Sequence, residues 1–207
     1  MKVLLINAGP HPKGCTYTAL REVEGALNEA GVETELFFVG NGPIRGCTGC
    51  GACRSTGRCM YEDAVNVALE KAKAADGFIF GSPVHYASAT GMATSFFDRL
   101  FYAGGRKVFG YKPGACVVSA RRAGTTAALD QLQKYLTISC MPVVSSQYWN
   151  MVHGNTPEDV LQDAEGLQIM RTLGRNMAWL LRSIEAGRAA GVELPTAEEP
   201  VRTNFIR

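Results

Sequence analysis

Four of the chain's seven cysteines are concentrated in one segment, CTGCGACRSTGRC, at residues 47–59. They are Cys47, Cys50, Cys53 and Cys59, spaced C-x2-C-x2-C-x5-C. In a reducing compartment such as the cytosol, clustered thiols indicate metal binding or redox chemistry rather than disulfides. The spacing is too compact for two zinc knuckles, whereas three thiolates at x2 intervals with a fourth nearby are typical ligands of an iron–sulfur cluster. We therefore expect these cysteines to hold a [4Fe-4S] cluster or, alternatively, to form a metal-free loop.

A second group of polar residues follows the first apolar segment. KVLLIN (2–7) predicts a buried strand, and AGPHPKGCTYT (8–18) leads from it into a helix. Backbone N–H groups at a helix start suit a phosphate. The segment matches neither G-x-G-x-x-G nor G-x-x-x-x-G-K-[ST]. An ordinary strand-to-helix turn capped by Thr16 explains the same residues, so this loop alone identifies no ligand.

Two later loops also carry chemically useful side chains. GSPVHYASATG (81–91) places two aromatic rings beside a stiff proline, which suits a flat aromatic ligand. SARRAGTT (119–126) supplies Arg121 and Arg122, which can bind carbonyl or anionic groups. The alternative in each case is a surface loop with solvated side chains.

The elements that must position these loops alternate between strand and helix. Strands are predicted at residues 2–7, 33–40, 77–80, 113–120 and 141–149. Helices are predicted at residues 17–31, 63–75, 89–102, 125–139 and 157–187. The strands lack apolar–polar alternation, which favours a parallel sheet with helices on both faces. Ligands of such sheets bind beyond the carboxyl ends of the strands. We therefore expect the three loops and the cysteine segment side by side at that edge.

Composition limits the other possibilities. The chain has 207 residues, of which 46% are apolar and 19% charged, and a net charge of +2. These values predict a globular protein with neither a nucleic-acid nor a membrane partner, and cytoplasmic is the expected location. Residues 1–191 are predicted to form the α/β domain. Residues 192–207 lose periodicity and are predicted to form a tail or an arm against a partner subunit.

Taken together, the three loops resemble the NADPH-dependent FMN reductases of the flavodoxin-like superfamily. The motifs are G-P-x-P-x-G-x-T at 9–16, G-S-P-V-H-Y at 81–86 and the Gly/Arg loop after the fourth strand, within a resemblance over residues 1–187. It implies a flavodoxin-like doubly wound five-stranded parallel sheet that binds FMN. The first loop would hold the FMN phosphate with Gly9, Pro10, His11, Lys13, Gly14, Cys15, Thr16 and Thr18. The other loops would hold the isoalloxazine ring with Ser82, Pro83, Val84, His85, Tyr86, Ser119, Ala120, Arg121 and Gly124.

The chain departs from the family pattern in three places. The family usually has G-S-P-R where residues 8–11 read Ala-Gly-Pro-His, which removes a hydroxyl and an arginine from the phosphate site. It usually has Asn in place of Cys15, and Tyr is common in place of His85. The changes at the phosphate site predict a weaker affinity for FMN, for which His11, Lys13, Thr18 and the backbone amides could compensate, while the ring-binding loop keeps the pattern better.

The resemblance implies an NAD(P)H-dependent flavin oxidoreductase that moves hydride from a nicotinamide to the flavin and on to a small-molecule or protein acceptor. No side chain is expected to be catalytic, while His85, Tyr86 and Arg121 would orient the ring or the nicotinamide. Flavin sites of this kind often lie between subunits, which implies a homodimer or homotetramer.

The cysteine spacing also resembles that of the iron-sulfur flavoproteins of the same superfamily. That similarity implies an alternative function, an electron carrier fed by ferredoxin, with the [4Fe-4S] cluster exchanging electrons with FMN. Related reductases keep part of such a motif without a cluster. A non-enzymatic binding module, as in response receivers, is disfavoured because Asn7 occupies the end of the first strand where those proteins have an acidic pocket.

Overall fold

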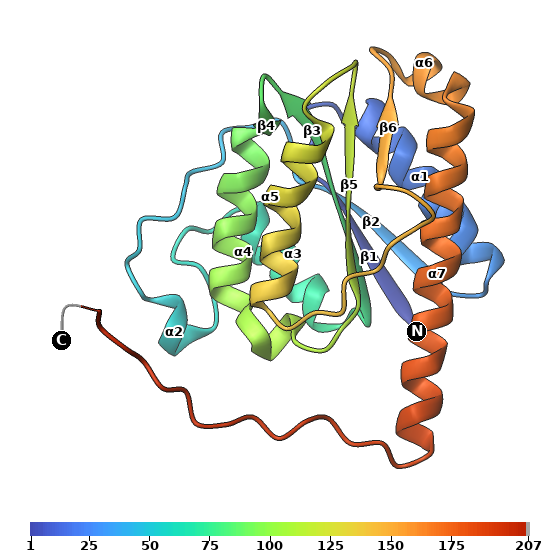
Figure 1. The fold of residues 1–207 in the computed structure, drawn as a ribbon. Helices are drawn as coiled ribbons and strands as arrows, with labels where there is room; N and C mark the ends of the chain where they lie inside the picture. Colours follow the sequence, from blue (N-terminus) through green and yellow to red (C-terminus); the bar gives the residue numbers. More distant parts are fainter. Residues whose placement is uncertain (206–207) are drawn as a thin grey trace.

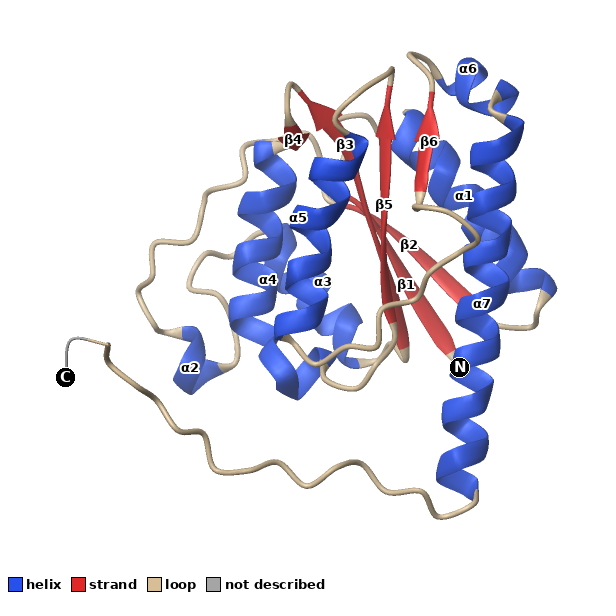
Figure 2. Ribbon diagram, viewed as in Figure 1, coloured by secondary structure: helices blue, strands red, loops and turns tan. Residues whose placement is uncertain are grey.

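A parallel sheet lies between two layers of helices in residues 1–205, the part of the chain that the computed structural model describes (Figures 1 and 2). The parallel strands are β1 (Lys2–Asn7), β2 (Glu33–Phe38), β3 (Gly77–His85), β5 (Gly114–Ala120) and β6 (Met151–His153). Their order is β2-β1-β3-β5-β6. This is the flavodoxin-like order, and it confirms the predicted doubly wound fold. The sheet of the described residues has six strands rather than five, because the two-residue β4 (Ser88–Ala89) pairs antiparallel with β3.

Helices cover both faces of the sheet (Figure 2). One layer contains α1 (Cys15–Glu29) and α7 (Ala164–Ala189), with the short α6 (Pro157–Gln162) before α7. The other contains α3 (Ala64–Lys73), α4 (Gly91–Phe109) and α5 (Thr125–Ile138). The four-residue α2 (Cys53–Thr56) lies inside the cysteine segment and was not predicted.

Two hydrophobic cores, one on each face, explain why the strands do not alternate. Val3 and Leu5 of β1 pack in the core beneath α1 and α7. Leu4 and Ile6 of the same strand pack in the core beneath α3, α4 and α5. All four side chains are fully buried, so the central positions of the strand are all apolar.

The predicted strand at 141–149 is wrong. In this segment Val143 makes an isolated bridge to Gly114, and the regular strand β6 begins only at Met151. Tyr148 and Trp149, whose residue types favour strands, are 53% and 56% exposed in the loop before β6. Pro142 O accepts a hydrogen bond from Gly114 N and Val144 N donates one to Gly114 O, both 2.9 Å, but the pairing does not extend further. The strand propensity of these residue types therefore did not determine the structure of this segment.

The predicted single helix at 157–187 is two helices that meet at Asp163. Oδ1 of Asp163 accepts a hydrogen bond from Gly166 N (2.9 Å) and caps α7, while Oδ2 accepts one from His153 N (2.7 Å). Thr156 begins α6 with a capping box that includes Asp159. Asp163, an acidic residue inside the predicted amphipathic helix, therefore marks the beginning of a second helix.

Residues 192–205 contain neither helix nor strand, and the last two positions of the predicted 192–207 tail lie outside the described residues. Figure 1 shows this segment running from the end of α7 back past the ends of the helices towards the side of α2. Within residues 1–205, no helix combines the length and apolar character needed to cross a bilayer.

Gly174 allows α7 to lie directly against α1. A Cβ atom at Gly174 would approach Ala26 Cβ and Val23 O to 2.8 Å each. We expect Gly174→Val to lower the free energy of unfolding by about 1–3 kcal/mol, because the helices must separate. Urea denaturation measures this. The matched control is Gly25→Ala on α1, where a Cβ meets nothing within 4 Å. It should stabilise the protein slightly, and equal losses in both variants would contradict the close approach.

Candidate functional site

A crevice opens at the carboxyl ends of β1, β3 and β5, where the predicted loops meet. Its volume is about 250 Å³. β1 and β3 are neighbours in the sheet although they are not consecutive in the sequence, so the crevice lies at the switch point where flavodoxin-like folds bind ligands. It is lined by Gly9, Pro10, His11, Gly14, Cys15, Thr16, Pro83, Val84, His85, Ser119, Ala120, Arg121, Gly154 and Asn155.

Asn7 shapes the loop that precedes α1. Its buried side chain accepts a hydrogen bond from Gly9 N (3.0 Å) and donates one to His11 O (3.3 Å). The absence of a side chain at Gly9 keeps this turn open, since a Cβ would lie 3.1 Å from Asn7 Oδ1 and 3.3 Å from Pro83 Cδ. Asn7, which stands where response receivers have an acidic pocket, therefore stabilises the conformation of this loop.

The start of α1 is available to an anion. Gly14 is its N-cap residue and supplies no side-chain hydrogen bond, so the first backbone N–H groups have no cap. Side chains do cap α3, α4, α6 and α7. The predicted cap, Thr16, instead lies inside the first turn, where its Oγ1 is 2.8 Å from Ser119 Oγ. This buried contact joins the first loop to the end of β5.

Cys15 contributes a neutral thiol to the crevice. Burial raises its pKa, and the nearby Asp159 and Glu158 raise that pKa further. Its Sγ lies 3.6 Å from Gly154 O. The thiol therefore adds no negative charge of its own beside the start of α1.

The carboxyl end of β3 approaches the loop after β5 at Gly124. Gly124 has a φ of +92°, which glycine adopts without strain, and a Cβ there would lie 2.8 Å from Val84 Cγ1. Tyr86, directly after β3, also has a positive φ, 57°, and its side chain is fully exposed. For a residue with a side chain this is a strained conformation.

Most of the predicted cofactor-binding residues line the crevice, and five do not. Ser82 is buried, and its hydroxyl accepts from Thr90 N and donates to Pro83 O, so it stabilises the loop. Thr18 donates to Gly14 O within α1. Lys13 is exposed, and Tyr86 and Gly124 lie at the rim rather than on the crevice wall.

Gly154 and Asn155 line the crevice and were missed. They follow β6, whose position was predicted too early in the sequence. The capping sequence Thr156-Pro157 was the available signal, because a helix start there requires the preceding strand to end near residue 153.

The cysteine segment forms a second pocket away from the crevice, which corrects the expectation that the two lie side by side. Among the described residues, the two cavities share no lining residue. Figure 1 shows α2 beside the lower part of α4, well away from the arrowheads of the strands. The pocket contacts α4 at Arg99 and Tyr102, roughly 12–16 Å along the helix from Gly91 at about 1.5 Å per residue. The long loop after β2 carries the segment down the outside of α4.

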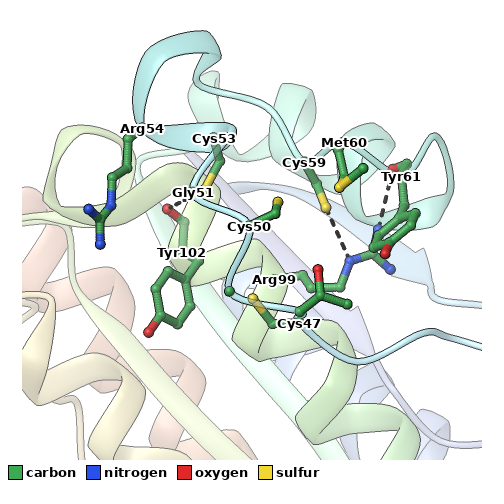
Figure 3. Close-up of a pocket in the computed structure, with 12 residues that line it drawn as sticks. Cys47, Cys50, Gly51, Cys53, Arg54, Cys59, Met60, Tyr61, Arg99 and Tyr102 are labelled. Atoms are coloured by element: carbon green, nitrogen blue, oxygen red, sulfur yellow. Dashed lines mark hydrogen bonds between the residues drawn. The ribbon is translucent and has the colours of Figure 1, made fainter.

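All four cysteines line this second pocket, whose volume is about 90 Å³ (Figure 3). Within residues 1–205, no three Cys, His, Asp or Glu side chains converge closely enough to bind one metal ion. This spread does not fit a single tetrahedral zinc. Four thiols are the usual ligand set of a [4Fe-4S] cluster, in which each thiolate binds a different iron atom. The donor set matches such a group by residue type.

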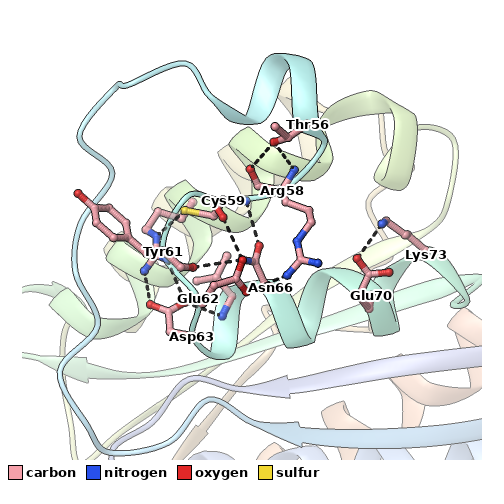
Figure 4. A network of polar contacts seen from close by, with 11 residues as sticks. Thr56, Arg58, Cys59, Tyr61, Glu62, Asp63, Asn66, Glu70 and Lys73 are labelled. Atoms are coloured by element: carbon pink, nitrogen blue, oxygen red, sulfur yellow. Dashed lines mark hydrogen bonds and ion pairs between the residues drawn. The ribbon is translucent and has the colours of Figure 1, made fainter.

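Cys59 is held more firmly than the other three. Asn66 accepts a hydrogen bond from Cys59 N and donates one to Cys59 O, both 2.9 Å (Figure 4). Cys59 Sγ accepts one from Arg99 Nε at 3.2 Å (Figure 3). Cys47 and Cys50 are exposed by contrast.

Known proteins share this fold and sequence pattern. Two iron-sulfur flavoproteins are similar along nearly their whole length. That of Methanocaldococcus jannaschii is 31% identical over 195 residues, 89% of this chain and 100% of the relative. That of Methanosarcina thermophila is 28% identical over 194 residues, 91% and 99% of the two chains. A flavodoxin from the domain Archaea aligns with a TM-score of 0.60 at 16% identity, covering 88% of this chain and 99% of that one. The sequence model of the NADPH-dependent FMN reductase family matches residues 1–156, and the chain belongs to that family.

Proposed function

We propose that the protein is an FMN-dependent oxidoreductase that accepts hydride from NADH or NADPH and passes electrons to a small-molecule or protein acceptor. The observation that carries this proposal is the crevice at the switch point, with an uncapped α1 on one side and the loops after β3 and β5 on the other. FMN combines an anionic phosphate with a flat ring. The crevice offers a separate surface for each.

The FMN phosphate would bind at the start of α1. The backbone N–H groups of Cys15 and Thr16 belong to the uncapped first turn, and the helix dipole favours an anion there. Lys13 and His11 lie at the same end and can add positive charge or hydrogen bonds. These groups replace the arginine that the family usually has at the position of His11.

The isoalloxazine ring would lie against the end of β3 and the loop after β5. Pro83, Val84 and His85 supply a largely apolar surface, and Arg121 lines the same crevice. When bound, FMN supplies the hydride-accepting chemistry at N5, and the protein supplies position and electrostatics. His85 and Arg121 would orient the ring and the nicotinamide, and no side chain is needed as a base.

A second function is supported by the cysteine pocket. All four thiols line it, and the relatives of similar length are named iron-sulfur flavoproteins. In this alternative the cysteines hold a [4Fe-4S] cluster, and ferredoxin rather than a nicotinamide reduces the protein. Within one subunit the two sites are separated along α4, so electron transfer between them favours a homodimer or homotetramer in which one subunit's pocket meets another's crevice.

The test is the anaerobic reduction of FMN-loaded protein. NADPH or NADH should bleach the visible flavin absorbance if the oxidoreductase proposal is correct. Bleaching by reduced ferredoxin alone would support the electron carrier instead. Failure to bind FMN at all would contradict both.

A further inference from the structure

Arg99 is a buried charge on α4, directly beneath the cysteine pocket. Its side chain is 1% exposed, yet none of its polar partners belongs to the flavin crevice. Nη1 and Nη2 form a bidentate pair with the Asp63 carboxylate, at 2.6 and 2.9 Å. A buried guanidinium is tolerated only when it is paired in this way.

Each nitrogen of the Arg99 guanidinium donates at least one hydrogen bond. In addition to Asp63, Nη1 donates to Arg45 O at 3.2 Å and Nη2 donates to Tyr61 O at 3.3 Å. The Tyr61 ring lies 5.1 Å from both the Arg45 and the Arg99 guanidinium carbons. The guanidinium is charged, as arginine always is in proteins.

The remaining donor points at sulfur. Asp63 takes the Nη edge of the guanidinium, which leaves Nε to donate to Cys59 Sγ at 3.2 Å (Figure 3). An ion pair that served only to hold α3 against α4 would not require this contact. Asn66 fixes the backbone of the same cysteine through its N–H and C=O (Figure 4). Backbone and side chain of Cys59 are thus both positioned before any group binds.

We infer that Arg99 is a positioning residue that orients the Cys59 thiolate and raises the reduction potential of the four-cysteine centre. The inference rests on the proposed cluster function. Hydrogen bonds to ligand sulfurs and nearby positive charge favour the more reduced state of an iron–sulfur centre. The negative charge of Asp63 offsets only part of this effect, because it lies on the edge of the guanidinium away from the sulfur.

The test compares three variants of the full chain, reconstituted anaerobically with iron and sulfide. The double variant Arg99→Gln/Asp63→Asn removes the buried charges together, and Asn at 63 can still accept the Val65 N–H that caps α3. Arg99→Lys keeps the charge, but the single ammonium group cannot donate to Cys59 and also bind both carboxylate oxygens of Asp63. Arg54→Gln is the matched control, since Arg54 lines the same pocket but is exposed.

The readouts are the midpoint potential of the centre and the EPR spectrum of its reduced form. The double variant should disfavour reduction by about tenfold, which is about 59 mV for a one-electron couple, with a changed EPR spectrum. Arg99→Lys should show a smaller shift in the same direction, and Arg54→Gln almost none. If the double variant does not fold, Arg99→Lys provides the comparison.

The outcomes separate the inference from the function on which it rests. Wild-type protein that takes up no iron refutes the cluster, and the inference falls with it. Wild-type protein with a full complement of iron, but with the same potential and EPR spectrum in the Arg99 variants, refutes the inference alone. A shift in Arg54→Gln as large as that in the Arg99 variants also refutes it, because a positive charge with no hydrogen bond to Cys59 would then act as strongly as Arg99.

Discussion

Cys50→Ser removes iron from the anaerobically reconstituted protein and leaves FMN binding unchanged. Cys50 lines the cysteine pocket, is exposed and lies far from the crevice wall. Loss of a thiolate ligand should lower the iron content by about tenfold or more. Iron per chain is measured by colorimetric assay, and FMN binding by the quenching of flavin fluorescence.

Cys140→Ser is the control for Cys50→Ser, since Cys140 lies outside both pockets among the described residues. It should retain iron and FMN. Iron retained in full by Cys50→Ser would show that Cys50 is not a ligand. FMN lost together with iron would contradict the separation of the two sites.

Gly124→Val weakens FMN binding without removing iron. The left-handed backbone at Gly124 disfavours a branched side chain, and its Cβ would press on Val84 Cγ1. The end of β3 and the loop after β5 must then move apart at the rim of the crevice. We expect a cost of about 1–3 kcal/mol, which is roughly a 5- to 140-fold weaker affinity for FMN.

Ala123→Val is the matched control for Gly124→Val. It adds a branched side chain to the neighbouring position of the same loop, where the residue is exposed. Its affinity for FMN should remain within about twofold of the wild type. If both variants bind FMN as tightly as the wild type, the approach of Gly124 to Val84 does not shape the site. An equal loss of affinity in both variants would point to a general disturbance of the loop.

Much of the fold follows from the sequence because buried parallel strands leave a clear signal. The central positions of the runs at 2–7 and 113–120 are all apolar, since the two faces of the sheet pack against different cores. The same pattern misled at 141–149, where Met141 and Val144 are buried in the cores without forming a strand. Burial alone does not reveal whether backbone groups join a ladder.

The crevice was predictable because its residues are local to the ends of strands. Loops at 8–14 and 81–86 reach the same edge whenever β1 and β3 are neighbours. Gly154 and Asn155 were lost when β6 was misplaced by a few residues. An error in one strand boundary therefore removed one wall of the site.

The position of the cysteine segment could not be predicted from strand order. The loop after β2 is long enough to leave the edge of the sheet, and its path depends on contacts with α3 and α4. Arg99 and Asn66 make those contacts through side-chain hydrogen bonds to Cys59. Such pairs join residues 40 and 7 positions apart and leave no periodic signal in the sequence.

The central claim is that the crevice holds FMN in a form that a nicotinamide can reduce. The most direct measurement is the visible absorbance of FMN-loaded Cys50→Ser protein, mixed with NADPH in the absence of oxygen. This variant removes the cysteine centre as a route for electrons. Rapid bleaching of the flavin band, at a rate that increases with NADPH concentration, is the predicted result. A flavin band that stays unbleached by NADPH and NADH, in the variant and in the wild type, would contradict the account.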